Sequence, residues 1–475
     1  MTLASGVRAD EVEQLKAQLR EMSAKLEALE TQQKKLAEKQ NTASTSAAPV
    51  PPPSSGSFPG SFLIPGTNTS MKIGGYVKLD IIDDLKGTNQ NGSTVDFSTI
   101  QIDGTPQAKR QNQVALTARQ SRLNIETRTP TEYGDLKTFI EGDFLGAGSN
   151  ETYSNSATLR MRHLYGELGG VLAGQSWSNF LDVPSMPETI EFNGPVGQEQ
   201  AVRQAQLRYT HSFGKEDTVA VAIENPEGDF SGADHGGLGT NGNAPSSRVS
   251  DLIPDLTARY LHTAPWGRVS LAGLVRRLAV DTGGSPQTFQ GPNGAFTFNG
   301  SAATWGYGAA LVGQFPTFGK DTLSVRVLGG PGIGRYISNA NSTSGSVTGV
   351  APAGLTNSNP GDGAVLSQDG TLHAITQYGG SVAYRHFWTD TLRSTVAVGA
   401  VHHENPMSYV PVNTLENEYS FHANLIWSPI PRADVGIEYI HGEAELSGQT
   451  AANKALGYGN QGSMDRVQVG VLYRF

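Results

Sequence analysis

The sequence predicts an all-β transmembrane barrel of about 16 antiparallel strands, preceded by an N-terminal α-helical coiled coil. Three features of the chain predict this fold class. A run of leucines at heptad spacing comes first, and short segments of alternating apolar and polar residues then fill the chain from residue 61 onwards. Short and long connections alternate between those segments, as they do in an up-and-down barrel.

The composition excludes several other classes of protein. The chain has 475 residues, of which 17% are charged and 57 are glycine. No segment approaches the ~20 consecutive apolar residues that a membrane-spanning helix requires. With no cysteine, the chain offers no thiol nucleophile, disulfide framework or cysteine-ligated metal. A formal net charge of −9 disfavours nucleic acid as a partner.

Residues 1–40 form the predicted coiled-coil unit, with one helix from about Asp10 to Gln40. Its apolar residues follow a 3-4 repeat at Val12, Leu15, Leu19, Met22, Leu26, Leu29 and Leu36. An apolar seam this narrow on a polar helix predicts self-association, without choosing between dimer and trimer. The alternative is a lone solvated helix or one docked on the body of the protein. Residues 41–60, rich in Pro, Ser and Ala, predict a semi-extended linker.

Residues 61–475 form the predicted barrel, and the last strand illustrates the pattern. From Val467 the residues at every second position are apolar, through to Phe475, while Gln468 and its alternates lie on the other face. In a barrel, the apolar face contacts lipid and the polar face lines a wet lumen. Taken alone, this segment equally fits a half-buried strand of a soluble sandwich.

The connections favour the barrel over the sandwich. Tight turns such as 213–216 and 318–321 alternate with long Gly/Ser/Asn-rich segments such as 227–250 and 331–370, and residues 86–112 form a long polar insertion. Short turns at one rim and long loops at the other are typical of an outer-membrane barrel. Aromatic residues beside the short turns predict an interfacial girdle.

Strand alternation also predicts a basic lumen. The inward basic set is Lys78, Arg122, Arg128, Lys137, Arg160, Arg162, Arg208, Arg259, Arg276, Arg326, Arg385, Arg393 and Arg466, against the inward acids Asp80, Glu126, Glu141, Asp143 and Glu438. Guanidinium groups in a poorly screened channel attract and hold carboxylates. The alternative is that these arginines pair with local acids and only keep the lumen wet.

One long connection, at about residues 178–198, differs from the others because it contains prolines, aromatics, apolar residues and acids. We expect it to fold into the barrel, to narrow the pore and to set Asp182, Glu188 and Glu191 against the arginine wall. Packing over the outer rim or at a subunit contact is the alternative.

Enzymatic interpretations find little support in the chain. In His402-His403-Glu404 the two adjacent imidazoles point to opposite faces of a strand, so they cannot share a metal. The glycine loop at 330–334 lacks the following helix that would cradle a phosphate. No nucleophile set is evident, and neither a metal nor a cofactor is expected. An outer-membrane hydrolase with a site built from distant loops is the remaining enzymatic alternative.

Several ordered motifs resemble those of the DcaP-like porins of Gram-negative outer membranes. They are Gly74–Asp80, Arg119–Leu123, Phe139–Phe144 and the run from Leu172 through Pro195. The resemblance implies a homotrimer of sixteen-stranded barrels, a periplasmic coiled coil and passive uptake of small anions, notably dicarboxylates. It also implies that the loop after the fifth strand is the constriction loop. The basic side of the constriction would be formed by Arg122, Arg160, Arg162 and Arg208. Arg203 would point outward by strand alternation, unless it lies above the lipid band.

The sequence therefore predicts a trimeric outer-membrane diffusion channel that prefers anions. The predicted constriction residues are Lys78, Arg122, Arg160, Arg162, Arg203, Arg208, Asp182, Glu188 and Glu191. Two alternatives stay open: a channel for neutral or aromatic solutes, and a coiled-coil tether for which the barrel is only an anchor.

Overall fold

The computed structural model describes residues 16–17, 20–21, 24–25, 27–35, 55–87, 92, 94–146, 149–150, 154–226, 253–284, 286–291, 294–338, 363–410 and 412–475. The chain divides into two compact units, Met1–Ser55 and Gly56–Phe475.

In the first unit, residues 27–35 are helical, and the side chain of Leu29 is 64% exposed. Lys25 forms an ion pair with Glu21 one turn away, with 3.0 Å between Nζ and Oε1. Of the predicted coiled-coil seam, Leu29 alone lies among the described residues, and Val12, Leu15, Leu19, Met22, Leu26 and Leu36 lie outside them. The coiled coil therefore stays a prediction.

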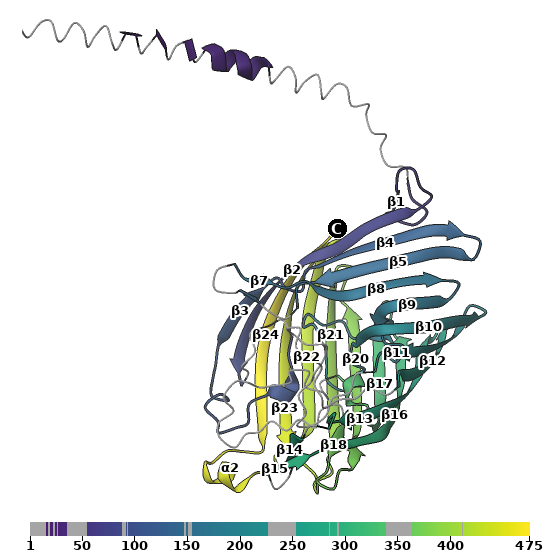
Figure 1. Ribbon diagram of the computed structural model, residues 1–475, viewed down its shortest axis with the longest axis vertical. Helices are drawn as coiled ribbons and strands as arrows, with labels where there is room; N and C mark the ends of the chain where they lie inside the picture. The colour runs from purple at the N-terminus through teal and green to yellow at the C-terminus, as the bar shows by residue number, and fades with distance from the viewer. Residues whose placement is uncertain are drawn as a thin grey trace, which may run out of the picture. The chain divides into compact units, whose positions relative to one another are not determined.

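The second unit is a closed wall of antiparallel strands (Figure 1). Its wall strands are β2 (Ser70–Lys86), β3 (Gln113–Thr117), β4 (Arg122–Thr131), β5 (Gly134–Asp143), β8 (Arg160–Leu168), β9 (Val171–Trp177), β10 (Arg203–Phe213), β11 (Asp217–Glu224), β12 (Asp255–Ala264), β13 (Gly267–Asp281), β16 (Ser301–Pro316), β17 (Thr322–Pro331), β20 (Thr376–Phe387), β21 (Leu392–Glu404), β22 (Leu415–Ile430), β23 (Ala433–Leu446) and β24 (Gln461–Arg474).

Sequence neighbours pair around the whole wall, and the last strand pairs with the first. β3 and β4 both pair with β2, at Ala115 opposite Ile82 and at Ile125 opposite Ile73, so they are two halves of one interrupted strand. Over the described residues the wall thus has 16 strands, as predicted. Because β2 also pairs with β24, the barrel has no free edge.

Small elements lie on the connections between the wall strands and before the first of them. The short strands are β1 (Phe62–Leu63), β6 (Ser149–Asn150), β7 (Ser156–Ala157), β14 (Gln287–Gly291), β15 (Gly294–Phe298), β18 (Ala364–Leu366) and β19 (Leu372–Ala374). The helical pieces are α2 (Ala451–Ala455) and the 3-10 turns η1 (Phe97–Thr99), η2 (Val183–Ser185) and η3 (Gly334–Tyr336). Within the described ranges, no helix is both long and apolar enough to span a membrane.

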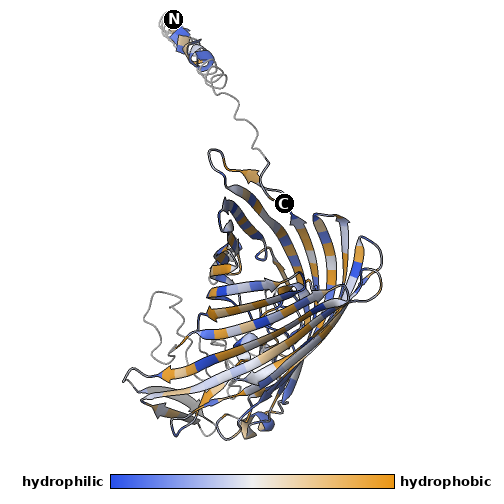
Figure 2. Cartoon of the chain, turned by 90° about the vertical axis from the view of Figure 1, so that its right-hand side faces the viewer, coloured by the Kyte–Doolittle hydropathy of each residue, from blue (hydrophilic) through white to orange (hydrophobic). Residues whose placement is uncertain are grey.

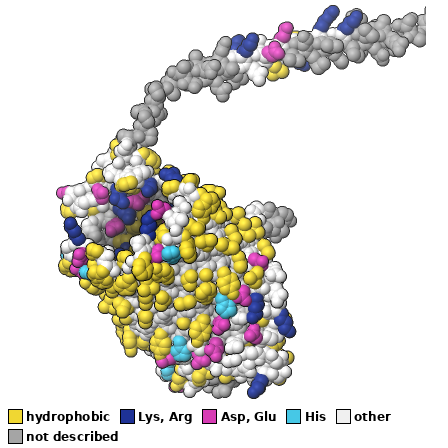
Figure 3. Space-filling view, turned by 180° about the vertical axis from the view of Figure 1, so that it is seen from behind, with side chains coloured by type: hydrophobic (Ala, Val, Ile, Leu, Met, Phe, Trp, Pro, Cys, Tyr) yellow, Lys and Arg dark blue, Asp and Glu magenta, His cyan; other side chains and the backbone are white. Residues whose placement is uncertain are grey.

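Alternate residues of each wall strand face opposite sides, as the sequence pattern predicts. On β2, Val77 is 55% exposed whereas Lys78 is buried, and on β24 Tyr473 is exposed whereas Arg466 is buried. Hydrophobic and hydrophilic residues alternate along the strands (Figure 2), and hydrophobic side chains cover much of the outer wall (Figure 3). An apolar exterior around a polar interior is the pattern of a barrel that stands in lipid.

The connections separate into a short-turn rim and a long-loop rim. Two residues link β4 to β5, β8 to β9 and β12 to β13, and the chain's last strand ends at the same rim. Trp266, Phe318 and Trp388 are exposed in short turns of this rim, which join β12 to β13, β16 to β17 and β20 to β21. Long connections such as 87–112, 178–202 and 282–300 lie at the opposite rim, so the predicted asymmetry of the loops is present.

Three long-loop segments fold back into the barrel. The first, which we call the inward loop, is residues 178–202 after β9, the fifth wall strand, and it buries Phe180 and Val196 almost completely. The second, residues 94–102, buries Phe97 against β22 and β23. The third, residues 332–338, buries Tyr336 and pairs with the inward loop through a bridge between Ile337 and Glu199.

The second and third segments differ from the sequence prediction. Residues 86–112 were predicted as a polar insertion, and 330–334 only as a glycine loop, yet both place apolar side chains in the core. Glycines on the inner wall make this packing possible. A Cβ added at Gly442 would lie 2.4 Å from Phe97 Cδ1, and one added at Gly399 would lie 2.0 Å from the Val196 carbonyl oxygen.

Candidate pore constriction

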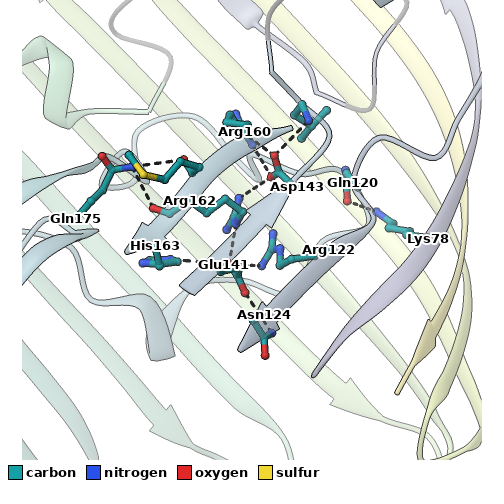
Figure 4. A network of polar contacts seen from close by, with 12 residues as sticks. Lys78, Gln120, Arg122, Asn124, Glu141, Asp143, Arg160, Arg162, His163 and Gln175 are labelled. Carbon is teal, nitrogen blue, oxygen red and sulfur yellow. Dashed lines mark hydrogen bonds and ion pairs between the residues drawn. The ribbon is translucent and has the colours of Figure 1, made fainter. Parts of the chain in front are cut away.

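A cluster of arginines and acids lines the inner wall on β4, β5 and β8 (Figure 4). Arg160 binds Asp143 with two hydrogen bonds, from Nε at 2.9 Å and from Nη2 at 2.7 Å. Arg162 bridges both acids, because Nε donates to Glu141 at 2.8 Å and Nη1 donates to Asp143 at 3.0 Å. We call this set, with Arg122 and Arg203, the wall cluster.

A bulge in β8 increases the density of polar groups in the wall cluster. Glu141 pairs with His163 and the next residue, Gly142, pairs with Met161, so Arg162 is the extra residue on β8. As a result Arg162 and His163 are both buried on the inner side, although they are adjacent in sequence. Bulges re-aim side chains in this way, and simple alternation of faces does not predict one.

Arg122 and Arg203 complete the cluster without the short carboxylate hydrogen bonds that Arg160 and Arg162 form. Arg122 Nη1 lies 3.5 Å from the Glu141 carboxylate, which already accepts the shorter bond from Arg162. Arg203, which strand alternation predicted to point outward, has its guanidinium 5.0 Å from the centre of the Trp177 ring. Among the described residues, Arg122 Nε and Arg203 Nη1 are buried donors without a hydrogen-bond acceptor.

Aromatic rings lie beside the guanidinium groups. Arg162 is 5.4 Å from the Trp177 ring centre and 5.6 Å from that of Phe192, while Arg160 is 5.7 Å from Phe192. Arg122 lies 5.1 Å from the centre of the Tyr76 ring. Cation–π contacts of this length hold guanidinium groups in place without neutralising them.

Lys78 connects the wall to the inward loop. Its ammonium donates to the Gln120 side chain and to the carbonyl oxygen of Ile190, both at 2.7 Å, and lies 2.9 Å from Asp80. Its charge is therefore locally balanced by one acid. The wall cluster, by contrast, holds four arginines against Glu141 and Asp143, which leaves a formal net charge of 4 − 2 = +2.

Asp182 of the inward loop lies far from the wall cluster, on the side of β12, β13 and β17. Arg268 donates two hydrogen bonds to its carboxylate, with 2.6 Å between Nη2 and Oδ1 and 3.0 Å between Nε and Oδ2. Ser185 also donates to this carboxylate. These hydrogen bonds, chiefly that of Arg268, hold the pKa of Asp182 below its usual value although burial opposes them. Asp182 thus fastens the start of the inward loop.

Glu188 fastens the middle of the inward loop to β20, β21 and β22. Arg393 binds it with two hydrogen bonds, at 2.8 Å from Nε and 2.6 Å from Nη2. Arg385 Nη1 lies 3.7 Å away, and Asn424 donates to the Glu188 carbonyl oxygen at 2.8 Å. This acid therefore binds arginines of the predicted inward set other than those of the wall cluster.

Glu191 contacts backbone rather than arginine. Its carboxylate accepts N–H groups from Val95 at 2.8 Å and from Asn193 and Gly194, both at 2.7 Å, so it joins the inward loop to the second inward segment. Burial raises the pKa of Glu191 to about 7, although these N–H donors favour the charged form. Asp182, Glu188 and Glu191 therefore hold the loop and leave the wall cluster unneutralised.

The predicted constriction residues thus form two groups. Arg122, Arg160 and Arg162 come together (Figure 4), and Arg203 lies beside the same Trp177 ring as Arg162. Lys78 lies beside the inward loop that faces them. Arg208 does not join them: on β10 its charge interacts instead with those of Glu224 and Glu167. Residues that sequence reasoning missed include Arg268, which binds Asp182, and Glu199, which accepts from Arg326 at 2.5 Å.

The wall cluster and the inward loop enclose a cavity of about 350 Å³. Tyr76, Arg122, Arg162 and Trp177 line one side of it, and residues 186–194 of the inward loop line the other. Figure 3 shows a hollow at one end of the barrel with Lys, Arg, Asp and Glu side chains around it. The cavity can therefore hold a small solute between guanidinium groups and the loop.

Within the part of the chain that the structure describes, the acids and histidines do not form a metal site. Over the described ranges, no group of three or more His, Asp or Glu residues is arranged to hold a metal ion. His402 and His403 bond to different partners, Asn417 and Gln377 respectively, and His403 is fully buried whereas His402 is not.

A closed barrel of 16 strands, with an apolar exterior, a charged interior and a loop folded inward from the fifth strand, defines the class of outer-membrane channel proteins. A family model described as "Porin subfamily" matches residues 59–311. The chain belongs to this porin family. Its members are non-enzymatic channels of the bacterial outer membrane, so the chain is not an enzyme.

Individual relatives agree with this assignment. The porin Omp2b of Brucella suis biovar 1 (strain 1330) is 28% identical over 227 residues, which cover 46% of this chain and 53% of the relative. The Omp2b porin of Brucella melitensis biotype 1 is 27% identical over 225 residues, with 46% and 53% covered. The chain spans about half the length of the curated relatives that it matches.

Solved structures share the fold over a greater length. The outer-membrane channel DcaP of Acinetobacter baumannii has a TM-score of 0.66 at 20% identity, and the match covers 89% of this chain and 100% of that chain. An anion-selective porin from Comamonas acidovorans has a TM-score of 0.51 at 11% identity, with 86% and 100% covered. The predicted resemblance to DcaP-like porins is confirmed at the level of the fold.

Proposed function

We propose that this porin is a passive diffusion channel that prefers small anions, such as dicarboxylates. The observation that carries the proposal is the net charge of +2 in the wall cluster, where Arg122 and Arg203 keep buried donors that no described residue accepts from. A carboxylate that enters the cavity meets the guanidinium groups of Arg122 and Arg162, which line it. In a narrow lumen with low-dielectric walls, an excess of positive charge concentrates anions and repels cations.

The inward loop supports this selectivity because each of its three acids is bound by partners outside the wall cluster. Asp182 is bound by Arg268 and Glu188 by Arg393, and Glu191 is bound by backbone N–H groups. The loop therefore sets the width of the passage without cancelling its charge. One structural neighbour, the porin from Comamonas acidovorans, is anion-selective, which is consistent with this chemistry on the same fold.

The same proposal includes the assembly of the protein. The barrel forms a trimer in the outer membrane, with the short-turn rim and the N-terminal unit on the periplasmic side. Residues 1–40 form a coiled coil that holds the subunits together, and residues 41–60 link it to the barrel of residues 61–475. The exposed Leu29 supports this because an exposed leucine on a charged helix is stabilised by contact with other copies of the helix.

Liposome swelling tests the channel and its preference together. Proteoliposomes of the full chain are diluted into iso-osmotic solutions of a dicarboxylate, a monocarboxylate or a sugar of matched size. We expect fastest swelling with the dicarboxylate and slowest with the sugar. Equal rates for all three would favour a channel for neutral solutes, and no swelling at all would favour an anchor that does not conduct.

A further inference from the structure

A broad apolar groove crosses the outer wall of the barrel on β10 to β13, β16 and β17. It has a volume of about 1160 Å³ and is lined by exposed apolar side chains such as Leu207, Val221, Leu256, Val275 and Tyr307. We call it the outer groove. These side chains occupy the outward positions of their strands, so the groove opens towards lipid rather than towards the lumen.

The floor of the outer groove is made of small residues that are paired across four neighbouring strands. Ala258 is opposite Gly273, Gly273 is opposite Ala309, and Ala309 is opposite Gly329. A Cβ added at Gly273 would meet no atom within 4 Å. The space above the floor is therefore open, and the larger residues on either side act as its walls.

A cation lies just beyond the outer groove, towards the long-loop rim. Along β13 and β16 the outward pair after Val275 and Tyr307 is Arg277 and Trp305. The Arg277 guanidinium is 5.0 Å from the Trp305 ring centre, and no carboxylate of the described residues forms an ion pair with it. Asp281, farther along the same face, accepts the Gly283 N–H at 2.8 Å instead.

An outward arginine on a barrel is costly in the hydrocarbon region and tolerated near the interface. Arg277 beside a tryptophan is therefore placed at headgroup depth, while the groove that begins one residue pair away extends into the acyl region. A lipid with an anionic phosphate headgroup and a long apolar chain matches both the Arg277 cation and the apolar groove. A second copy of this chain would have to bring both an acid and a complementary ridge, and a neutral lipid leaves Arg277 uncompensated.

We propose that the outer groove is a binding site for an anionic lipid that carries a phosphate, with this phosphate at Arg277 and Trp305 and an acyl chain above Gly273. The site is independent of the proposed transport function because Arg277, Trp305 and Gly273, on which it depends, occupy outward positions of their strands. It predicts that headgroup charge and groove volume contribute separately to lipid retention.

Native mass spectrometry of the full chain in detergent tests the proposal, with dioleoylphosphatidylglycerol as the anionic probe and dioleoylphosphatidylcholine as the zwitterionic one. We expect tighter retention of the anionic probe by the unmodified protein. Arg277→Gln should weaken that retention about fivefold, the effect of one arginine near a membrane surface, and should abolish the preference between the probes. Gly273→Leu, which fills open space, should reduce retention of both probes.

Lys109→Gln is the matched control because Lys109 is an exposed cation in a long loop, and its loss should leave retention unchanged. Equal retention of the two probes by the unmodified protein, or an Arg277→Gln variant that keeps its preference, would overturn the proposal. So would a Gly273→Leu variant that dissociates subunits while retaining lipid normally, since the groove would then be a subunit contact.

Discussion

The double substitution Arg122→Gln and Arg203→Gln tests how the wall cluster selects ions. It removes the two guanidinium groups that lack close acids and leaves Arg160 and Arg162 on Asp143 and Glu141, as in the unmodified protein. The formal charge of the cluster falls from +2 to 0. Because no buried carboxylate loses its closest partner, the barrel should keep its fold.

The expected size of the effect follows from the excess charge. A unit charge about 6 Å from a permeating ion contributes about 0.7 kcal/mol at the dielectric constant of water, so two excess charges contribute about 1.4 kcal/mol. Screening at 0.1 M salt, where the Debye length is about 10 Å, leaves roughly half of this. An anion is stabilised and a cation is destabilised by that amount, so the difference of about 1.5 kcal/mol corresponds to roughly tenfold selectivity.

Zero-current potentials across a planar bilayer with a KCl gradient measure this ratio. We expect the unmodified channel to favour Cl⁻ over K⁺ about tenfold and the double variant to show a ratio near one. The double variant Lys109→Gln and Lys320→Gln removes two exposed charges outside the lumen and should retain the original ratio. If the Arg122→Gln and Arg203→Gln variant keeps its tenfold ratio, the excess charge of the wall cluster does not set selectivity.

Three further changes test the loop, the helix and a buried acid. Asp182→Asn removes the carboxylate that binds Arg268 and leaves that cation mostly buried, so the attachment of the inward loop should weaken by about 3 kcal/mol. Single-channel recordings should then show a larger, fluctuating conductance, and an unchanged conductance would contradict the role of Asp182 in holding the loop. Deletion of residues 10–40 should lower the temperature at which trimers dissociate on semi-native gels and leave the conductance per channel unchanged; equally stable trimers would refute the coiled coil. Because burial raises the pKa of Glu191 from 4.5 to about 7, the folded state holds this proton more tightly than the unfolded state. Its contribution is complete below pH 4.5 and lost as the pH rises through 7, by about 3 kcal/mol in all. The unfolding temperature of the unmodified barrel should therefore fall relative to that of Glu191→Gln over this range, and a constant difference between the two proteins would be the contrary result.

Local patterns in the sequence were sufficient to predict the barrel. Alternation on β2 and β24 correctly assigned Val77 and Tyr473 to the outside and Lys78 and Arg466 to the inside, because the two faces of a strand meet different solvents. The number of wall strands and the separation of short turns from long loops followed from the same periodicity. These features depend on neighbours in sequence, which is why one sequence sufficed.

Contacts between distant segments were harder to predict. The bulge that turns both Arg162 and His163 inward depends on the register between β5 and β8, and the alternation of one strand carries no such information. The inward segments around Phe97 and Tyr336 are short, and their apolar residues are scattered among polar ones. Inner-wall glycines such as Gly399 and Gly442 were the available signal, since a glycine at a lumen position leaves room for a loop.

The binding partners of the acids in the inward loop were equally hard to predict from the sequence. Asp182, Glu188 and Glu191 were predicted to stand against the arginine wall. Asp182 and Glu188 bind arginines on different strands, Arg268 and Arg393, whereas Glu191 binds backbone N–H groups. The chemistry of the residues indicated that they would be paired. Which side of the lumen each one reaches depends on the path of the inward loop, and that path is set by packing among the three inward segments.

The most direct test of anion selection is the zero-current potential of the unmodified full-length channel, measured in tenfold KCl gradients at low and at high total salt. We expect Cl⁻ to be preferred at low salt and the preference to shrink at high salt, because mobile ions screen the wall cluster. A preference for K⁺, or a Cl⁻ preference that is independent of salt, would contradict selection by the arginines of the constriction.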